Sequence, residues 1–338
     1  MKLFQRTCLA TAALLGVSSA SAQTVLTVSS WLPPTHSLST VQKEWCDLLE
    51  KNTAGKVKCN ILPRGVSAAP GTYDAVKNGL ADVSYTVHGY TPGRFVYTQM
   101  AELPFLGNSA ESISVAFQKA AQKNPVMIAE HQGVKVITLF THGPGIPFNT
   151  KKSITKVEDF SGLKFRVGGG MVNEMAKALG MNATLKPAPD SYELLSGGVM
   201  DGTLFPAEST LSFRIDKLIK HATIFPGGLY NTSFVFLMNQ DKYNKLAPDE
   251  KKAVDAISGE VAARMYGRGW DKVDRVALGM MQANQVTVVR PDAKFIADVK
   301  ARTAPLEQKW VKDAEAKGLK DAAKVLAEFR AEIAKQEK

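Results

Sequence analysis

The residues best suited to binding chemistry lie in one short segment, residues 165–170, which reads FRVGGG. Arg166 falls near the end of a predicted β-strand, and strands of open α/β sheets point their carboxyl ends at the crevice where ligands bind. The glycines at 168–170 lead into a predicted helix, whose first N–H groups favour an anion. A guanidinium makes two parallel charge-assisted hydrogen bonds to a carboxylate. The segment therefore predicts a carboxylate site that includes Arg166 and Gly168; the alternative is a surface arginine beside a flexible loop.

Several aromatic side chains are predicted at the same kind of sheet edge. Trp31 follows the first predicted strand, His88 and Tyr90 follow a strand that ends near Val87, and Phe205 ends another. Each of them alone could be an ordinary core residue. Together they describe a crevice with one fixed cation and aromatic walls, which is the usual composition of a small-molecule site.

Catalytic and metal-binding motifs are missing from the sequence. None of the five histidines has the HExxH spacing, and neither CxxC nor GxSxG occurs. Residues 153–156 (SITK) match the S-x-x-K pattern of secreted penicillin-recognising enzymes, but the partner motifs SDN and KTG are absent. A surface turn explains this segment better. We therefore expect no enzymatic activity, no cofactor and no metal site.

The N-terminus has the pattern of a secretory signal peptide. Lys2 and Arg6 form a positive region, residues 8–17 form a short apolar run, and residues 20–22 (ASA) form an A-x-A cleavage site. Cleavage there leaves Gln23 as the mature N-terminus and a protein in the periplasm. The alternative is a buried N-terminal helix.

Composition narrows the class of protein further. A length of 338 residues suggests about two domains, and 45% apolar with 22% charged residues excludes a disordered or collagen-like chain. Lys2 and Arg6 are the charged residues of the predicted signal peptide, so its removal lowers the formal net charge from +10 to +8. A basic surface suits anionic solutes, acidic membranes or nucleic acid. Export and the lack of a basic run with interleaved aromatics make nucleic acid an unsuitable partner.

Two cysteines, Cys46 and Cys59, remain in the mature chain. An even pair in an oxidising compartment suggests a disulfide. Two separately buried thiols are the alternative, and the sequence leaves this open.

Strand and helix patterns alternate along the chain, which predicts an α/β fold with much parallel sheet. A long helical pattern runs from near Ala247 to about Gln282, and one helix of that length would brace both units. The absence of a linker favours two lobes joined by several crossings. The other predicted helices cover residues 37–49, 71–80, 112–123, 171–179, 190–195 and two C-terminal segments, and the strands cover 25–30, 57–62, 81–88, 134–140, 163–167, 183–185, 201–205, 233–238 and 286–289.

Several short segments, spread over nearly all of the mature chain, are informative by their order and spacing. They are residues 26–31 (LTVSSW) with Pro34 and His36, 79–83 (GLADV), 102–106 (ELPFL), 162–167 (GLKFRV), 199–202 (VMDG) and 246–250 (LAPDE). In these segments the chain resembles the solute-binding proteins of tripartite ATP-independent periplasmic (TRAP) transporters, of the dicarboxylate-receptor type.

This resemblance implies a fold like that of type II periplasmic binding proteins, with a ligand cleft between two α/β lobes and a long bracing helix. The lobes would be residues 23–143 plus 232–271 and residues 144–231 plus 272–338. It also implies a receptor, not an enzyme, that closes around a small organic acid and delivers it to membrane permease subunits. We expect this receptor to be a monomer. In the family, the arginine of the G-L-K-x-R segment pairs the ligand carboxylate, and here that residue is Arg166.

Departures from the family pattern indicate the ligand class. Residues 143–148 (GPGIPF) lack the second arginine of sialic-acid receptors, which also have a glutamate where Val87 stands. Residues 203–206 (TLFP) replace the Gln-Glu-Asn-Pro or Glu-Trp residues of many members, which argues against a metal-bridged 2-oxo acid. We therefore predict a compact monocarboxylate with an apolar or aromatic body. His88, Tyr90, Tyr230 or Asn231 could bond a hydroxyl or oxo group on it.

Two other functions use the same scaffold. One is a ligand-sensing subunit for a membrane kinase, which relies on the same closure. The other is a secreted enzyme, for which the sequence offers no pair of nucleophile and base.

Overall fold

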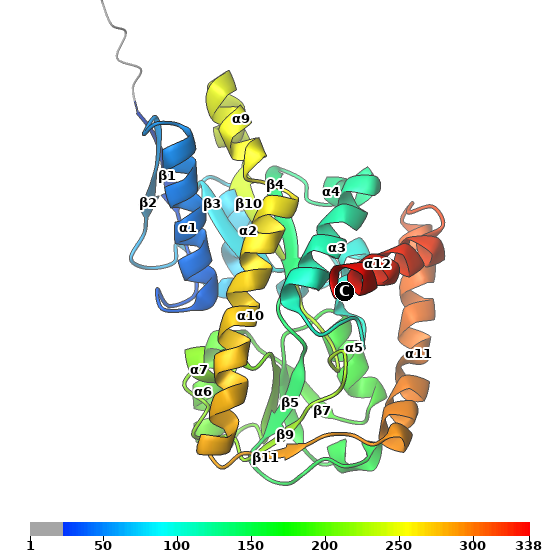
Figure 1. Ribbon diagram of the computed structural model, residues 1–338. Helices are drawn as coiled ribbons and strands as arrows, with labels where there is room; N and C mark the ends of the chain where they lie inside the picture. The colour runs from blue at the N-terminus through cyan, green and yellow to red at the C-terminus, as the bar shows by residue number, and fades with distance from the viewer. Residues whose placement is uncertain (1–22) are drawn as a thin grey trace, which may run out of the picture.

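Two β-sheets divide the chain into two lobes (Figure 1). In the computed structural model, which describes residues 23–338, the strand order is β2-β1-β3-β10-β4 in the first sheet and β11-β9-β5-β8-β6-β7 in the second. The predicted signal peptide, residues 1–22, lies outside the described residues. The two-lobed α/β fold predicted from the sequence is therefore confirmed.

The first sheet is mixed and forms the centre of the first lobe. Strand β1 pairs in parallel with β2 and β3, whereas β10 is antiparallel to both β3 and β4. Every residue of β3 and β10 is buried, because helices cover both faces of the sheet there. The strands are β1 (Thr24–Val28), β2 (Val57–Ile61), β3 (Val83–Val87), β4 (Val134–Thr141) and β10 (Ser233–Asn239).

The second sheet places the predicted anion-binding segment beside an aromatic strand end. Strand β6 is parallel to both β7 and β8, so the carboxyl ends of β6 and β8 meet at one sheet edge. The short strands β5 and β9, which were not predicted, pair antiparallel to each other, and β5 is also antiparallel to β8. The strands are β5 (Ile146–Asn149), β6 (Lys164–Val167), β7 (Asn182–Leu185), β8 (Gly202–Phe205), β9 (His221–Thr223) and β11 (Thr287–Val289).

The long helical pattern forms two helices, α9 (Pro248–Ala256) and α10 (Glu260–Ala283). The single helix predicted from near 247 to 282 was wrong, because Gly259 breaks it. Gly259 has φ +61°, outside the helical region, and its N–H donates to Ile137 O at 2.7 Å. Helix α10 packs on α3 and β4 of the first lobe and on α7 and β11 of the second, so it still braces both (Figure 1).

The remaining helices cover the sheets and connect the lobes. Helix α11 packs against α5, and α12 packs against α3 of the first lobe, so the chain ends on the first lobe although residues 272–338 were expected in the second. Within residues 23–338, no helix has the length and apolar character needed to cross a bilayer. The helices are α1 (Ser37–Asn52), α2 (Thr72–Lys77), α3 (Ala110–Lys123), α4 (Pro125–Ala129), α5 (Met171–Ala178), α6 (Ser191–Ser196), α7 (Glu208–Ser212), α8 (Gln240–Lys245), α11 (Ala293–Ala316) and α12 (Ala322–Gln336).

Cys46 and Cys59 form a disulfide, with a Cα–Cα distance of 5.8 Å. The bond joins α1 to β2, the edge strand of the first sheet. This confirms the disulfide over two separate thiols.

Candidate ligand-binding site

A cavity of about 40 Å³ lies between the lobes. Six of the eight residues predicted to bind a ligand line it: Trp31, Tyr90, Arg166, Gly168, Phe205 and Tyr230. Trp31 and Tyr90 come from the first lobe, whereas Arg166, Gly168 and Phe205 come from the edge of the second sheet. Residues distant in the sequence therefore meet because the two lobes face each other.

Arg166 is the cation of this cavity and is only 2% exposed. Its Nε donates to Lys186 O at 2.8 Å, and its guanidinium carbon lies 4.6 Å from the centre of the Phe205 ring. Burial lowers the pKa of Arg166, while the nearby phenols of Tyr90 and Tyr230 raise it. The charge of Asp190 also raises this pKa, but no aspartate or glutamate within residues 23–338 lies within ion-pair distance of the guanidinium. A buried guanidinium without a carboxylate partner is suited to an anionic ligand.

Gly168–Gly170 brings the second lobe into direct contact with the first. Gly169 has φ +94°, and a Cβ atom there would lie 2.3 Å from the carbonyl oxygen of Gly89 in the first lobe. Backbone therefore packs on backbone beside Arg166, and only glycine allows this approach.

Aromatic rings form the walls next to Arg166. Trp31 donates its indole N–H to Tyr85 O at 2.9 Å and contacts the Tyr90 ring edge-on, with centroids 5.7 Å apart. The Tyr90 hydroxyl accepts a hydrogen bond from Ala188 N at 2.9 Å, which links the lobes. Phe205 stacks on Phe213. The walls are thus fixed by contacts on both sides of the cavity.

The structure does not bring His88 or Asn231 to the cavity. Both ring nitrogens of His88 have partners in the protein, since Nδ1 lies 3.0 Å from Ser233 Oγ and Nε2 lies 2.8 Å from Nε2 of His131. With its side-chain nitrogen facing the main chain, Asn231 donates to Gly143 O at 2.8 Å and His142 O at 3.1 Å. Asn231 therefore holds the crossing between β4 and β5.

The cavity also includes residues that the sequence analysis did not select, among them His36, His142 and Trp270. His142 directly follows β4, as His88 follows β3, so the rule of strand ends could have found it. Trp270 lies in the middle of α10, and only the path of this helix across both lobes brings it to the site. No local signal marks such a residue.

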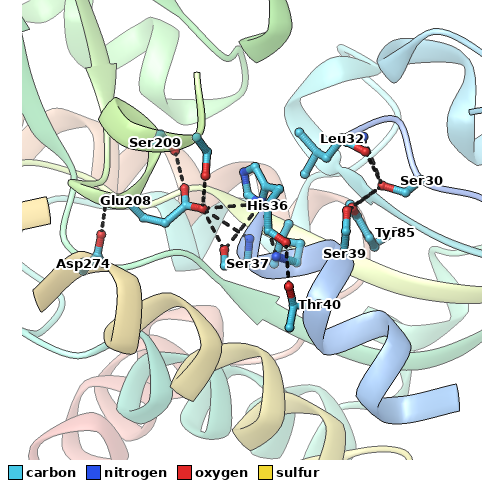
Figure 2. Close-up of polar contacts among 12 residues, drawn as sticks. Ser30, Leu32, His36, Ser37, Ser39, Thr40, Tyr85, Glu208, Ser209 and Asp274 are labelled. Carbon is cyan, nitrogen blue, oxygen red and sulfur yellow. Dashed lines mark hydrogen bonds and ion pairs between the residues drawn. The ribbon is translucent and has the colours of Figure 1, made fainter. Parts of the chain in front are cut away.

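A buried carboxylate from the second lobe binds the start of α1 in the first (Figure 2). Glu208 Oε1 accepts hydrogen bonds from Ser37 Oγ at 2.9 Å and Ser37 N at 3.4 Å. On its other side, Glu208 N donates to Asp274 Oδ1 of α10 at 2.7 Å. Glu208 thus joins the two lobes close to His36.

A second carboxylate joins the lobes in the opposite sense. Glu102, from the first lobe, accepts a hydrogen bond from Met171 N at the start of α5 at 2.8 Å. Its other oxygen, Oε1, lies 2.8 Å from Ser233 Oγ. Burial raises the pKa of Glu102 to about 7. We refer to Glu102 and Glu208 as the interlobe carboxylates.

The part of the chain that the structure describes contains no group of three or more histidine, cysteine, aspartate or glutamate side chains arranged to hold a metal ion. The chemistry of the cavity is instead that of one guanidinium, aromatic rings and neutral polar groups.

Comparison with protein families gives a match to DctP, described as bacterial extracellular solute-binding protein, family 7, over residues 28–313. Among solved structures, a TRAP periplasmic solute-binding protein from Bordetella bronchiseptica with bound (R)- and (S)-mandelate is 43% identical, with a TM-score of 0.89. The alignment covers 92% of this chain and 99% of that one.

Two further solved structures bind aromatic acids. A TRAP solute-binding protein from a marine metagenome, in complex with 3-hydroxybenzoate, is 32% identical with a TM-score of 0.87 and covers 94% of this chain and 100% of its own. Another, from Rhodoferax ferrireducens with copurified benzoate, is 29% identical with a TM-score of 0.86 and covers 93% of this chain and 99% of its own.

Proposed function

Because the chain belongs to the DctP family of bacterial extracellular solute-binding proteins, we propose that it binds an aromatic monocarboxylate between its lobes and delivers it to the membrane subunits of a TRAP transporter. The receptor role follows from the family.

The observation that carries the proposal is the buried guanidinium of Arg166. A buried charge without a partner is strongly destabilising, whereas a carboxylate that fits its planar fork offsets that penalty. Arg166 already donates its Nε to Lys186 O. The Tyr90 hydroxyl lies beside the guanidinium as well, and the ligand carboxylate would receive N–H groups that these two partners leave free.

Charge and lining support a monocarboxylate with an aromatic body. Arg166 is the one cationic residue among those that line the cavity, because burial keeps the lining histidines His36 and His142 neutral by lowering their pKa values. A second carboxylate on the ligand would remain unpaired. The rings of Trp31, Phe205 and Phe213 suit a flat apolar body. Similar proteins with bound mandelate, 3-hydroxybenzoate and benzoate support the same ligand class.

Binding would proceed by opening and closing of the lobes. A cavity of about 40 Å³ is much smaller than the ~150 Å³ cavity that accepts benzene in a protein core. The lobes must therefore separate to admit a ligand, and side chains that line the cavity must shift to make room for it. A ligand that contacts Arg166 in one lobe and Trp31 in the other favours the closed state by its extra contacts.

Calorimetric titration of the mature chain, refolded to remove carried-over ligand, tests the assignment of Arg166. We expect benzoate or mandelate to bind, Arg166→Ala to abolish binding, and Arg166→Lys to weaken it strongly because an ammonium cannot form the paired bonds. The matched control is Arg290→Ala, which removes an exposed arginine from the same lobe. Unchanged affinity in Arg166→Ala would refute the site.

We further propose that the mature protein is a periplasmic monomer that releases its ligand unchanged. Recovery of the ligand after long incubation and denaturation tests the absence of turnover. N-terminal sequencing of the periplasmic form should begin at Gln23, and its mass in solution should be that of one chain. A processed ligand would instead identify an enzyme.

A further inference from the structure

We propose that His36, His142 and Trp270 form a hydroxyl-recognition site in the cavity wall, so that the receptor prefers aromatic acids that carry a hydroxyl group. This inference rests on the proposed function, because it names the substituent of the acid that Arg166 binds. All three residues line the cavity, and each is at most 3% exposed. The indole of Trp270 contacts both imidazoles edge-on, with centroids 5.5 Å from His36 and 5.9 Å from His142.

His142 presents a hydrogen-bond acceptor. Its Nδ1 lies 2.5 Å from the carbonyl oxygen of Gly143, which can only accept, so Nδ1 carries the proton. Burial and the charge of Arg166 lower the pKa of His142 to about 4, and the neutral ring then has a bare Nε2. The protein has fixed this tautomer through the main chain.

His36 presents the opposite polarity. Its Nδ1 accepts a hydrogen bond from Leu38 N at 3.2 Å, as the N-cap of α1, so the proton of the neutral ring is on Nε2. Glu208 Oε1 lies 3.5 Å from Nδ1, too far for a good hydrogen bond, and already accepts from the hydroxyls of Ser37 and Ser212. Nε2 of His36 is therefore a donor.

Trp270 adds a second donor that needs a partner. Its indole N–H is buried and has no acceptor within residues 23–338. A buried donor without an acceptor costs about 1–3 kcal/mol. An oxygen atom of the ligand is a natural acceptor for it.

One acceptor beside two donors matches a hydroxyl group, which donates one hydrogen bond and accepts others. A hydroxyl can donate to His142 Nε2 and accept from His36 Nε2–H or Trp270 Nε1–H. A carbonyl or a second carboxylate lacks the proton that His142 requires. An unsubstituted ring leaves all three groups unpaired. The arrangement therefore selects against both alternatives.

The experiment compares matched pairs of acids that differ by one hydroxyl: 3-hydroxybenzoate with benzoate, and mandelate with phenylacetate. The two pairs distinguish a hydroxyl on the ring from one next to the carboxylate. Dissociation constants are measured by calorimetry for the wild type, His142→Phe, His36→Asn and the control His221→Phe. Asparagine retains an N-cap for α1, and His221 lies on β9 outside the cavity lining.

We expect the wild type and His221→Phe to bind the hydroxylated member of at least one pair about tenfold or more tightly. In His142→Phe that preference should fall to about threefold or less, because the acid without the hydroxyl no longer leaves His142 unpaired and binds at least as tightly as before. His36→Asn should reduce the preference too. Equal affinity within both pairs in the wild type, or a preference that survives both substitutions, would overturn the inference but leave the proposed function intact. Failure of every acid to bind would instead overturn the proposed function and the inference with it.

Discussion

Glu102→Gln is expected to stabilise the protein at neutral pH and to leave its stability unchanged near pH 4.5. The reason is a buried chain of polar groups in which Glu102 follows His131, His88 and Ser233. His131 donates from Nδ1 to the carbonyls of Met127 and Ile128, so its bare Nε2 accepts from His88 Nε2–H at 2.8 Å. His88 Nδ1 then needs the hydroxyl proton of Ser233, 3.0 Å away.

The protonation state of Glu102 decides whether each contact in this row of polar groups has a hydrogen-bond donor. An ionised Glu102 accepts the hydrogen bond that the Ser233 hydroxyl donates. Ser233 then has only lone pairs to turn toward His88 Nδ1, which is itself an acceptor. A protonated Glu102 donates to Ser233 and frees the Ser233 proton for His88. The hydrogen-bond count therefore agrees with the effect of burial, which raises the pKa of Glu102 from 4.5 to about 7.

This pKa sets the sign and size of the effect. Between pH 4.5 and about 7 the folded state holds a proton on Glu102 that the unfolded state has lost, so stability falls as pH rises through this range. The rise in pKa corresponds to about 3 kcal/mol once the pH exceeds 7. Glutamine resembles the neutral acid and does not titrate. With its oxygen facing Met171 N, its NH2 loses only the long 3.3 Å hydrogen bond that Ser233 N donates to Oε1. Asp274, whose pKa burial raises to about 8, is present in both proteins and cancels in the comparison.

Urea unfolding of the ligand-free mature chain at pH 4.5 and pH 7.5 measures the difference. We expect Glu102→Gln to match the wild type at pH 4.5 and to exceed its free energy of unfolding by up to about 3 kcal/mol at pH 7.5. Glu328→Gln, at an exposed ion pair with Lys123, should show no such pH-dependent gain. A wild type that is the more stable protein at pH 7.5 would refute the reasoning, because Glu102 would then be a stabilising carboxylate.

Two further predictions concern the closed contact and the disulfide. Gly169→Ala should weaken ligand binding at least tenfold in calorimetry, because the added Cβ would lie 2.3 Å from Gly89 O. The control Gly180→Ala has φ +77° and similar backbone strain, but no atom lies within 4 Å of the added Cβ, so it should bind normally. Equal losses of affinity in the two variants would contradict the explanation. Replacing both Cys46 and Cys59 by serine should lower the free energy of unfolding by about 3 kcal/mol in urea. A reductant should destabilise the wild type by a similar amount and leave the double variant unaffected, and a reductant effect on the double variant would count against the bond as the cause.

The sequence predicted those features that depend on local pattern. The strand, glycine run and helix around Arg166 are predicted by the pattern of consecutive residues. The structure forms β6, Gly168–Gly170 and α5 there. The break at Gly259 was missed because glycines elsewhere in the same pattern, such as Gly267, lie inside α10. Only a tertiary hydrogen bond, from Gly259 N to Ile137 O, separates the two cases.

The composition of the cavity was harder to predict than its anion-binding end. His88 and His142 both follow a strand, yet one ring turns into the core of the first lobe and the other faces the cavity. The partners of His88 are Ser233 and His131, which lie far from it in the sequence. The partner of His142 is the carbonyl of Gly143, which a turn of the main chain brings to its ring. Trp270 reaches the site because α10 spans both lobes. Such positions follow from the fold rather than from spacing.

The interlobe carboxylates bear on how membrane subunits could distinguish the closed receptor from the open one. Each lobe contributes one carboxylate and one helix N-terminus, and each helix N-terminus is bound by the carboxylate of the opposite lobe. When the lobes separate, water replaces these partners, so the net gain from each pair is small, about 1 kcal/mol for a typical hydrogen bond. These two pairs by themselves therefore hold the lobes together only weakly, and the contacts of the proposed acid would add to them. Because both pairs form only in one relative orientation, the shut receptor is a single shape, which membrane subunits can distinguish from the many orientations of the open one.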